Sequence, residues 1–354
     1  MRIAQIAPLY EAVPPKLYGG TERVVSYLTE ALVDLGHDVT LFASGDSVTN
    51  ARLEPAWPRA LRLDPSIRDA LAPHMVLLER VRRVAHEFDV LHFHLDYLPF
   101  PLFSTLDTPF VTTLHGRLDL PELQPVFDSF TQAPVISISD SQRLPLMQAN
   151  WRSTIHHGLP EKLLTPQSDR KPEYLAFLGR ICPEKRVDTA IRIAAMSGLP
   201  LKIAAKVDKA DRDYFKAEIE PLLSQAHVEF VGEIDETQKA GFLSGAKALL
   251  FPIDWSEPFG LVMIEAMACG TPVIAFNRGS VPEVIEPGVT GFIVEDAEGA
   301  VGALHHIDSL SRETIRAQFE RRFTSQTMAR NYVDAYLALT ETARRPALRR
   351  VAAG

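Results

Sequence analysis

Short apolar runs alternate with segments of helical periodicity through the first half of the chain. The runs that predict strands are 2–7, 38–43, 89–94, 109–114, 134–139 and 153–157. Between the first two runs, apolar residues recur at helical spacing over 21–35, and Gly36 follows as a left-handed helix cap. Continuous apolar strands separated by helices are typical of a parallel sheet covered on both faces.

The same alternation restarts after a polar, proline-rich stretch without helical or strand periodicity. Predicted strands then fall at 174–179, 201–206, 228–232, 248–252, 272–276 and 291–295, and predicted helices at 187–196, 211–225, 236–246, 259–268 and 325–343. We therefore predict an α/β protein with two Rossmann-like, doubly wound parallel-sheet domains facing across a cleft. The expected division is a first domain at 1–160, a linker at 161–173 and a second domain at 174–324. The helix and tail at 325–354 are expected to pack back across the first domain.

Length and composition fit this two-domain prediction. The 354 residues exceed the usual size of a single core, and 46% hydrophobic with 23% charged residues is ordinary for a globular protein. A net charge of -8 argues against a general nucleic-acid binder. Cys182 and Cys269 are too few for a disulfide framework and are expected to be buried thiols. The start "MRIAQIAP" lacks a signal-peptide core, and no apolar run approaches a membrane span, so we expect a cytoplasmic protein.

Candidate ligand-binding residues follow the predicted strands, because ligands of open parallel sheets lie beyond the carboxyl ends of the strands. Gly19 and Gly20 precede the first predicted helix, where a bare backbone and a helix amino end favour an anion. The alternative is an ordinary turn, which is the commoner reason for two glycines before a helix. His115 follows the run at 109–114, where a structural histidine is the alternative.

Two basic residues follow the first strand of the second domain. Arg180 and Lys185 stand five apart in the segment "RICPEKR". A planar guanidinium fork and a point charge together suit a diphosphate. Two solvated surface cations are the alternative interpretation.

The segment at 254–276 carries two carboxylates in apolar surroundings. Phe259, Gly260 and Leu261 open a predicted helix whose free amides can receive a phosphate. Glu265, two turns further on, can accept two hydroxyl hydrogen bonds, as from a ribose, and Glu257 can accept hydroxyls of a sugar. The alternatives are an ion pair for Glu265, although its sequence neighbours offer no cation at helical spacing, and a helix-end charge for Glu257. Taken together, these features predict a nucleotide sugar as ligand.

The same stretches resemble the retaining GT-B glycosyltransferases of family four. "EPFGLVMIE" with "AMACGTPVIAF" is similar to the E-x7-E region of that family, "FLGRICPEKRVD" to its Gly-Arg…Lys segment, and 7–42 to its Gly-Gly loop and helix. The resemblance covers nearly the whole chain. It departs at His157-Gly158, where the family commonly has Asn-Gly at the turn between domains.

The resemblance implies a role for individual residues. Arg180 and Lys185 would neutralise the diphosphate and Gly20 would approach it. His115 would touch the transferred sugar near its exocyclic hydroxymethyl group. The base would lie near the strand ends at Lys206 and Gly232.

Acceptor recognition is less specified by the sequence. Asp96, Tyr97, Arg117 and Asp119 follow strand ends of the first domain and are candidates for acceptor contact, with exposed loop residues as the alternative. The tail at 341–354 has four Arg against one Glu, which allows a weak peripheral membrane contact, as for relatives with lipid acceptors; a solvated terminus is the alternative. The acceptor itself is not predicted.

We therefore expect an enzyme that transfers a hexose from a nucleotide-diphosphate sugar to an acceptor hydroxyl with retention of configuration. A UDP-sugar is favoured, and GDP- or ADP-sugars are further candidates. No cofactor and no metal are expected, because no Asp-x-Asp pair is expected after any strand and Arg180 and Lys185 take the metal's place. Two other functions stay open: a non-hydrolysing nucleotide-sugar epimerase and a catalytically silent nucleotide-sugar binder.

Overall fold

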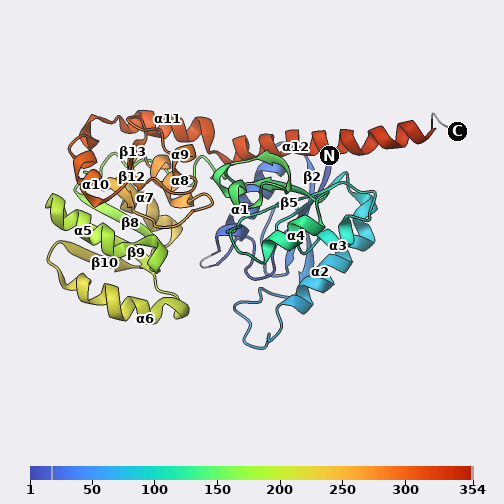
Figure 1. The fold of residues 1–354 in the computed structure, drawn as a ribbon, viewed down its shortest axis with the longest axis horizontal. Helices are drawn as coiled ribbons and strands as arrows, with labels where there is room; N and C mark the ends of the chain where they lie inside the picture. Colours follow the sequence, from blue (N-terminus) through green and yellow to red (C-terminus); the bar gives the residue numbers. More distant parts are fainter. Residues whose placement is uncertain (17–18, 352–354) are drawn as a thin grey trace. The chain divides into compact units, whose positions relative to one another are not determined.

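The computed structural model describes residues 1–16 and 19–351, with side chains described as far as Glu341. The chain forms two compact units (Figure 1). Unit 1 contains Met1–Gly158 and the C-terminal residues from Ser325, and unit 2 contains Leu159–Thr324. Each unit is built on its own parallel sheet with helices on both faces, which confirms the predicted fold class.

Unit 1 contains a seven-stranded sheet in the order β3-β2-β1-β4-β5-β6-β7, with all neighbours parallel. The strands are β1 (Arg2–Ile6), β2 (Asp38–Ser44), β3 (Arg52–Trp57), β4 (Val90–Phe93), β5 (Phe110–Thr113), β6 (Pro134–Ser137) and β7 (Asn150–Thr154). The helices are α1 (Gly20–Asp34), α2 (Leu71–Val84), α3 (Phe100–Phe103), α4 (Leu123–Ser129) and α12 (Ser325–Val351), with 3-10 turns η1 (Ala85–Glu87) and η2 (Ser141–Leu146).

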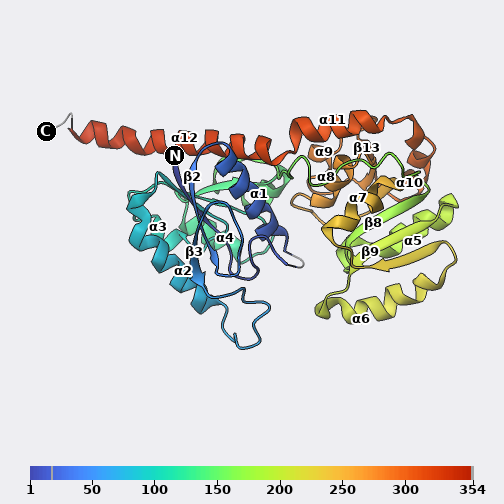
Figure 2. The ribbon, with the colours of Figure 1, turned by 180° about the vertical axis from the view of Figure 1, so that it is seen from behind.

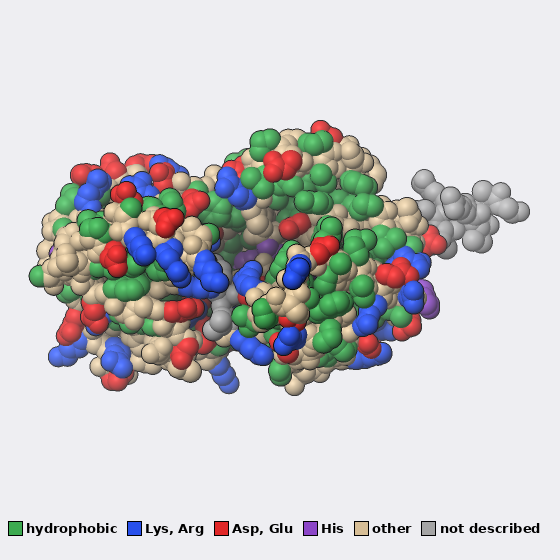
Figure 3. All heavy atoms as spheres, turned by 90° about the horizontal axis from the view of Figure 1, so that it is seen from below, with side chains coloured by type: hydrophobic (Ala, Val, Ile, Leu, Met, Phe, Trp, Pro, Cys, Tyr) green, Lys and Arg blue, Asp and Glu red, His purple; other side chains and the backbone are tan. Residues whose placement is uncertain are grey.

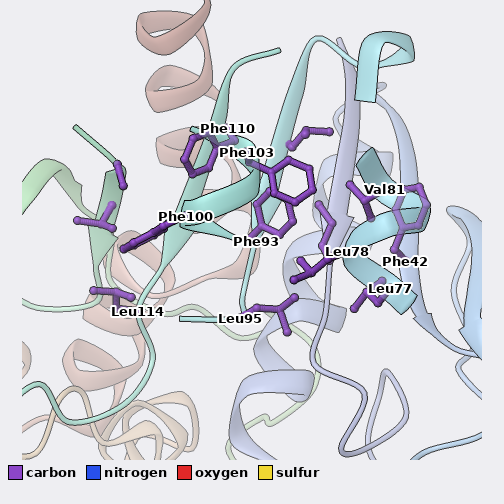
Figure 4. Close-up of a cluster of buried hydrophobic side chains, with 14 of the residues drawn as sticks. Phe42, Leu77, Leu78, Val81, Phe93, Leu95, Phe100, Phe103, Phe110 and Leu114 are labelled. Carbon is purple, nitrogen blue, oxygen red and sulfur yellow. The ribbon is translucent and has the colours of Figure 1, made fainter. Parts of the chain in front are cut away.

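The two faces of this sheet differ in polarity because successive strand residues point to opposite sides. Ile6 and Phe93 belong to the large apolar core under α2, α3 and α4, part of which Figure 4 shows. On the other face, Gln5, His92 and His94 are fully or almost fully buried as well. The central strands β1 and β4 therefore carry an apolar side and a polar, buried side.

Helix α12 covers part of the polar side. It packs against α1 within unit 1 (Figure 2), and its Tyr332 and Tyr336 are fully buried. A tyrosine buries a large ring but needs a partner for its hydroxyl group. The polar side of the sheet supplies those partners. The basic tail predicted at 341–354 lies, beyond Glu341, outside the residues whose side chains are described.

Unit 2 contains a six-stranded sheet in the order β10-β9-β8-β11-β12-β13, again all parallel. The strands are β8 (Tyr174–Arg180), β9 (Leu201–Lys206), β10 (Val228–Gly232), β11 (Ala246–Phe251), β12 (Val273–Phe276) and β13 (Gly291–Val294). The helices are α5 (Val187–Ser197), α6 (Arg212–Tyr214), α7 (Glu236–Ser244), α8 (Leu261–Ala268), α9 (Val281–Val284), α10 (Ala297–Leu304) and α11 (Arg312–Arg322). The 3-10 turns are η3 (Pro183–Lys185), η4 (Lys209–Asp211), η6 (Glu220–Ser224) and η7 (Ile307–Ser309), and η5 (Phe215–Ile219) is a π-helical turn.

Most predicted strands match observed ones, and two differences have a physical reason. The strand expected at 153–157 is β7 at Asn150–Thr154, so His157 lies after the strand rather than in it. Strand β3 was not predicted, because its sequence contains Pro55 and charged residues; it lies at the edge of the sheet, where proline is tolerated. Residues 161–173 contain neither helix nor strand.

Other expectations from composition can be compared directly. Both cysteines are free and buried, as predicted, and burial raises the pKa of each thiol. Basic and acidic side chains are interspersed on the face shown in Figure 3. Within the described part of the chain, no helix combines the length and apolar character needed to cross a lipid bilayer.

Candidate functional site

The loops that follow β8 and β11 meet at the carboxyl end of the unit 2 sheet. Lys185, in η3 after β8, forms an ion pair with Glu257, in the loop after β11. The ammonium group also lies 5.4 Å from the ring centre of Phe251 and 5.5 Å from that of Trp255. Trp255 donates its indole N–H to the same carboxylate at 3.1 Å. Both charged groups are therefore held by aromatic neighbours as well as by each other.

The backbone and Asp254 fix the two loops against each other. The amide of Asp254 donates to the carbonyl of Glu184 at 2.9 Å. Its carboxylate lies 3.3 Å from Arg186 of the first loop and 3.8 Å from Arg278 of a third loop, which follows β12. This shared carboxylate joins three strand-end loops into one assembly.

The third loop supports Glu257 through a close backbone contact. Gly279 has a φ of +54°, and a Cβ atom there would lie 2.4 Å from both the amide nitrogen and the carbonyl oxygen of Glu257. Ser280 donates its amide to the Glu257 carbonyl at 3.0 Å and its hydroxyl to the Phe259 carbonyl at 2.8 Å. Only glycine allows this approach, so the position of Glu257 depends on a residue 22 positions later in the chain.

Helix α8 begins at Leu261 with Gly260 as its amino cap. Gly260 has a φ of +79°, and a Cβ atom there would lie 2.9 Å from Met263 Cε and 3.0 Å from Phe251 Cζ, so the position needs glycine on both counts. The side chain of Phe259 is 2% exposed and packs edge-on against Phe323. The amides at the start of α8 lie at the positive end of the helix dipole, which suits an anion.

Glu265 in α8 is 4% exposed and has a cationic partner. Lys239 of α7 lies 2.7 Å from its carboxylate and 3.2 Å from that of Glu236. The ion pair given as the alternative for Glu265 is therefore present, and its cation comes from a neighbouring helix rather than from the same helix. The ion pair satisfies the buried charge and leaves the second carboxylate oxygen, Oε2, outside that contact.

Arg180 and the residues after β9 form an acidic and basic cluster of their own. Arg180 Nη1 lies 3.7 Å from the carboxylates of both Asp208 and Asp211, and Lys206 lies 3.0 Å from Asp208. Gly232, at the end of β10, has a φ of +83°. The expectation that no Asp-x-Asp pair follows a strand was wrong, because Asp211 and Asp213 form one after β9. No group of three or more metal-ligating side chains occurs among the described residues.

In unit 1, the predicted His115 is half-buried and belongs to a group of histidines whose other members are buried. Its Nε2 lies 2.8 Å from Nδ1 of His94, and its ring stacks on His157 with centroids 5.3 Å apart. Burial lowers the pKa of His115 to about 3 and holds the pKa of His94 and His157 well below its ordinary range. The imidazoles are therefore neutral at physiological pH.

The Gly19–Gly20 loop leads into α1 beside two buried carboxylates. A Cβ atom on Gly19 would lie 2.9 Å from Pro15 and 3.2 Å from Glu22 Oε2, whereas one on Gly20 would meet no described residue within 4 Å. Glu22, in the first turn of α1, has its pKa raised by burial, and nearby Glu11 pairs with Arg62 at 3.0 Å. The amino end of α1 therefore carries the carboxyl group of Glu22 in its first turn, with Glu11 close by.

The candidates for acceptor contact lie on the surface of unit 1. Asp96 has a φ of +51° and, like Tyr97, is exposed. Arg117 and Asp119 are bonded to each other through two contacts of 2.7 and 2.8 Å, which lower the pKa of Asp119. Because each of these two side chains is bonded to the other, their positions do not indicate that either one binds the acceptor substrate.

Sequence reasoning missed several residues that support these groups: Gln5, His94, His157, Lys239, Asp254, Trp255, Gly279 and Tyr336. One signal was available, because the alternation in "LHFH" places His92 and His94 on the same side of a buried strand. Most of the others had no signal, because their partners are distant in sequence; Trp255 is the exception, since it stands two residues before its partner Glu257.

Fold and family comparison agree on the class of protein. Residues 18–152 match the model described as Glycosyltransferase Family 4, and residues 164–325 match the model described as Glycosyl transferases group 1. Together with the two doubly wound units, these matches define a glycosyltransferase with the GT-B fold. The chain belongs to the family-4 type, with a glycosyl transferases group 1 region at its C-terminal side.

Individual relatives are more distant. Phosphatidyl-myo-inositol mannosyltransferase of Mycolicibacterium smegmatis is 27% identical over 91% of this chain and 88% of its own length. Sucrose-phosphate synthase of Thermosynechococcus elongatus superposes with a TM-score of 0.77 at 23% identity, covering 96% of this chain and 99% of that one. HepE of Anabaena, solved in complex with UDP and glucose, gives 0.72 at 18% identity, covering 96% of this chain and 100% of that one. The two structural likenesses show the fold.

Proposed function

We propose that this glycosyltransferase moves a hexose from a nucleotide-diphosphate sugar to an acceptor hydroxyl, with retention of configuration and without a metal ion. The observation that carries the proposal is the meeting of Lys185, Glu257 and the amino end of α8 at the carboxyl ends of β8 and β11. This end of the sheet is where open parallel sheets bind ligands. A cation, helix amides and a carboxylate together suit a diphosphate joined to a sugar.

Each donor group has a proposed partner among these residues. Arg180, Lys185 and the amides of 259–261 bind the diphosphate, with Gly19 and Gly20 of unit 1 as further backbone contacts. Glu265 accepts hydroxyl hydrogen bonds from the ribose, and Glu257 accepts them from the transferred sugar. Lys206 and Gly232 lie on the side of the base.

The proposed reaction is a front-face displacement. The acceptor hydroxyl attacks the anomeric carbon from the side on which the diphosphate leaves, and the departing diphosphate oxygen takes the acceptor proton. The carbon–oxygen bond to the diphosphate breaks as the new glycosidic bond forms. Arg180, Lys185 and the α8 amides stabilise the negative charge that grows on the leaving group, as preorganised donors do in other enzymes.

The relatives support the donor class and leave the acceptor open. HepE was solved with UDP and glucose, and further structures of it contain UDP or UDP-glucose. This favours a UDP-sugar, with GDP- and ADP-sugars as the other candidates. The names of the mannosyltransferase and the sucrose-phosphate synthase point to different acceptors, so neither is assigned to this chain.

A single assay tests the donor, the stereochemistry and the metal independence. The protein is incubated with UDP-, GDP- or ADP-hexoses and candidate acceptors in excess EDTA, and release of nucleoside diphosphate is measured. NMR of the product's anomeric proton then reports the configuration. Retention in EDTA supports the proposal. An inverted product, or activity that EDTA abolishes and Mg²⁺ or Mn²⁺ restores, contradicts it, and the Asp211–Asp213 pair would then be the first metal site to test.

Besides the nucleotide-sugar donor, we propose a membrane surface as a binding partner. The arginines of the C-terminal tail would make this peripheral contact. Each basic residue near an anionic surface contributes about 1 kcal/mol. Co-sedimentation with vesicles containing anionic lipid compares the full chain with a chain that ends at residue 343. Weaker binding of the shorter chain supports the contact, and equal binding or none contradicts it.

A further inference from the structure

The polar side of the unit 1 sheet contains a continuous hydrogen-bonded chain that ends at His115. Gln5 of β1 and His92 of β4 are register partners in neighbouring strands. The Gln5 amide nitrogen lies 3.2 Å from His92 Nδ1 and 3.0 Å from the hydroxyl of Tyr336 in α12. The Gln5 amide oxygen lies 2.9 Å from Nε2 of His94, whose Nδ1 lies 2.8 Å from Nε2 of His115.

The amide of Gln5 gives this chain a direction. An amide oxygen only accepts hydrogen bonds, so His94 must carry its proton on Nε2 to donate to it. A neutral imidazole has one N–H, which leaves Nδ1 of His94 as an acceptor. His115 must therefore donate from Nε2, and its own Nδ1 is left without a proton.

The other end of the chain is consistent with this direction. The Tyr336 hydroxyl lies 2.6 Å from His92 Nδ1, and His92 Nε2 lies 2.7 Å from the hydroxyl of Thr113. With the amide nitrogen of Gln5 and the phenol both directed at His92 Nδ1, His92 carries its proton on Nε2. Burial keeps these imidazoles neutral. Each ring therefore carries one N–H, and the donor and acceptor of each hydrogen bond stay defined.

The free end of the chain is His115 Nδ1. This atom is shielded from solvent and has no hydrogen-bond partner among the described residues. Leaving a buried acceptor unsatisfied is costly, and such groups in folded proteins usually have a functional explanation or an unseen partner.

We propose that Gln5 and His94 are positioning residues that fix His115 in the Nε2–H form and so present Nδ1 as an obligatory acceptor for a hydroxyl group. The inference rests on the proposed function in taking that hydroxyl to belong to the donor sugar. It adds to the sugar contact the polarity of the hydrogen bond: the sugar hydroxyl donates and the histidine accepts. A donor sugar without a hydroxyl at that position leaves the acceptor unpaired.

The tautomer is measured directly in the intact protein. Long-range ¹H–¹⁵N correlation spectra of protein labelled with ¹⁵N-histidine distinguish a protonated ring nitrogen from a bare one, and His115 is assigned by the signal lost in His115→Gln. We expect His115 and His94 both in the Nε2–H form. A His115 with its proton on Nδ1, or an averaged mixture of the two forms, overturns the inference. This measurement is made on the protein without any substitution in the network.

A matched pair of substitutions tests the role of Gln5. Gln5→Glu keeps an oxygen that can accept from His94, whereas Gln5→Met keeps the length of the side chain and removes the acceptor. We expect the His115 tautomer to persist in Gln5→Glu and to become mixed in Gln5→Met. Equal spectra for the two variants contradict the positioning role.

Ligand titration separates this inference from the proposed function. UDP and UDP-glucose are the probes, and the readout is the ¹⁵N shift of His115 Nδ1. We expect UDP-glucose but not UDP to shift it, and we expect His115→Gln, whose amide can replace only Nε2, to lower turnover by roughly three- to tenfold, as for loss of one neutral hydrogen bond. Binding of both probes without a shift of Nδ1 overturns the acceptor role. Failure of every nucleotide sugar to bind counts against the proposed function instead, while the tautomer spectrum still decides the direction of the network.

Discussion

The two units of this glycosyltransferase have similar parallel sheets, but the side chains near the ends of their strands differ in charge. Unit 1 places neutral groups there: Gln5, His94 and His115 are linked by hydrogen bonds, and burial keeps the histidines uncharged. Unit 2 places an ion pair there, Lys185 with Glu257, and a second pair, Lys239 with Glu265, joins helices α7 and α8. A shared fold therefore does not determine the electrostatics of a site.

The difference follows from what each arrangement can do. A network of neutral groups has a fixed donor and acceptor pattern, so it can select the orientation of hydroxyl groups. Cations with a helix amino end stabilise negative charge, including charge that develops during a reaction. We expect variants in unit 2 to affect binding and turnover of an anion, and variants in unit 1 to affect recognition of a neutral group.

The largest effect is expected from removing a cation in unit 2. Arg180→Ala and Lys185→Ala should each lower kcat by about 10²–10³, because each would withdraw a preorganised donor from the leaving diphosphate. Lys202→Ala is the matched control, since Lys202 also pairs with a carboxylate, Glu229, but at the opposite end of β9. Steady-state kinetics with the donor found by the assay above gives the comparison. Similar losses in all three variants would mean that overall charge, and not the strand-end site, is responsible.

The backbone support of Glu257 should have the next largest effect. Gly279→Ala forces a Cβ atom against the Glu257 backbone at a positive φ, and we expect it to lower the free energy of unfolding by about 3 kcal/mol and to reduce turnover. Gly288 also has a positive φ, +77°, but open space around it, so Gly288→Ala should cost only about 1 kcal/mol. Chemical denaturation of both variants measures the difference. A Gly279→Ala protein with the stability of Gly288→Ala would show that the loop adapts easily.

The sequence predicted what depends on local pattern. Apolar strands, the helical stripe over 21–35 with Gly36 as its cap, and the segments around Lys185 and Glu257 could all be recognised because their signals lie within a few neighbouring residues. The edge strand β3 could not, because edge strands need neither an apolar run nor the absence of proline.

Contacts between side chains of different helices, strands and loops could not be predicted from a single sequence. Lys239 neutralises Glu265 from a different helix, and Gly279 supports Glu257 from a different loop. The polar side of β1 and β4 shows the same limit: "LHFH" places two histidines on one face, but only the tertiary structure brings Gln5 and Tyr336 to them. Pattern predicts which face a residue occupies, and packing decides what it meets there.

The two carboxylates of unit 2 are expected to differ in what they bind. Glu265→Ala should weaken binding of UDP about tenfold or more, since a charged acceptor for two ribose hydroxyls is lost. Glu257→Ala should lower turnover and leave UDP binding largely unchanged, because its proposed partner is the sugar. Isothermal titration with UDP and kinetics with the full donor separate the two, and Glu229→Ala, which removes a carboxylate at the other end of the sheet, is the control. Parental UDP affinity in both variants would make the ribose assignment wrong.

The smallest expected effect is on the pH dependence of stability, and it tests the neutral side of the comparison. Burial holds the pKa of His92, His94, His115 and His157 below the value of an exposed histidine. Below about pH 6.5 the unfolded chain therefore binds protons that the folded protein does not, and the free energy of unfolding must fall as the pH is lowered. Each such histidine contributes at most about 1.4 kcal/mol per pH unit, and its full contribution is present above about pH 6.5.

His157→Asn should accordingly flatten the acid side of the stability curve by up to about 1.4 kcal/mol per pH unit. Denaturant unfolding at a series of pH values between 7 and 5 measures the slope, with His86→Asn, a substitution of an exposed histidine, as the control. The comparison between the units predicts the direction of the result, because a charged histidine cluster would lose stability as the pH rises, not as it falls. A slope that steepens in His157→Asn, or that changes equally in the control, would show that the unit 1 strand ends carry charge in the folded protein, and the contrast with the ion-paired strand ends of unit 2 would then disappear.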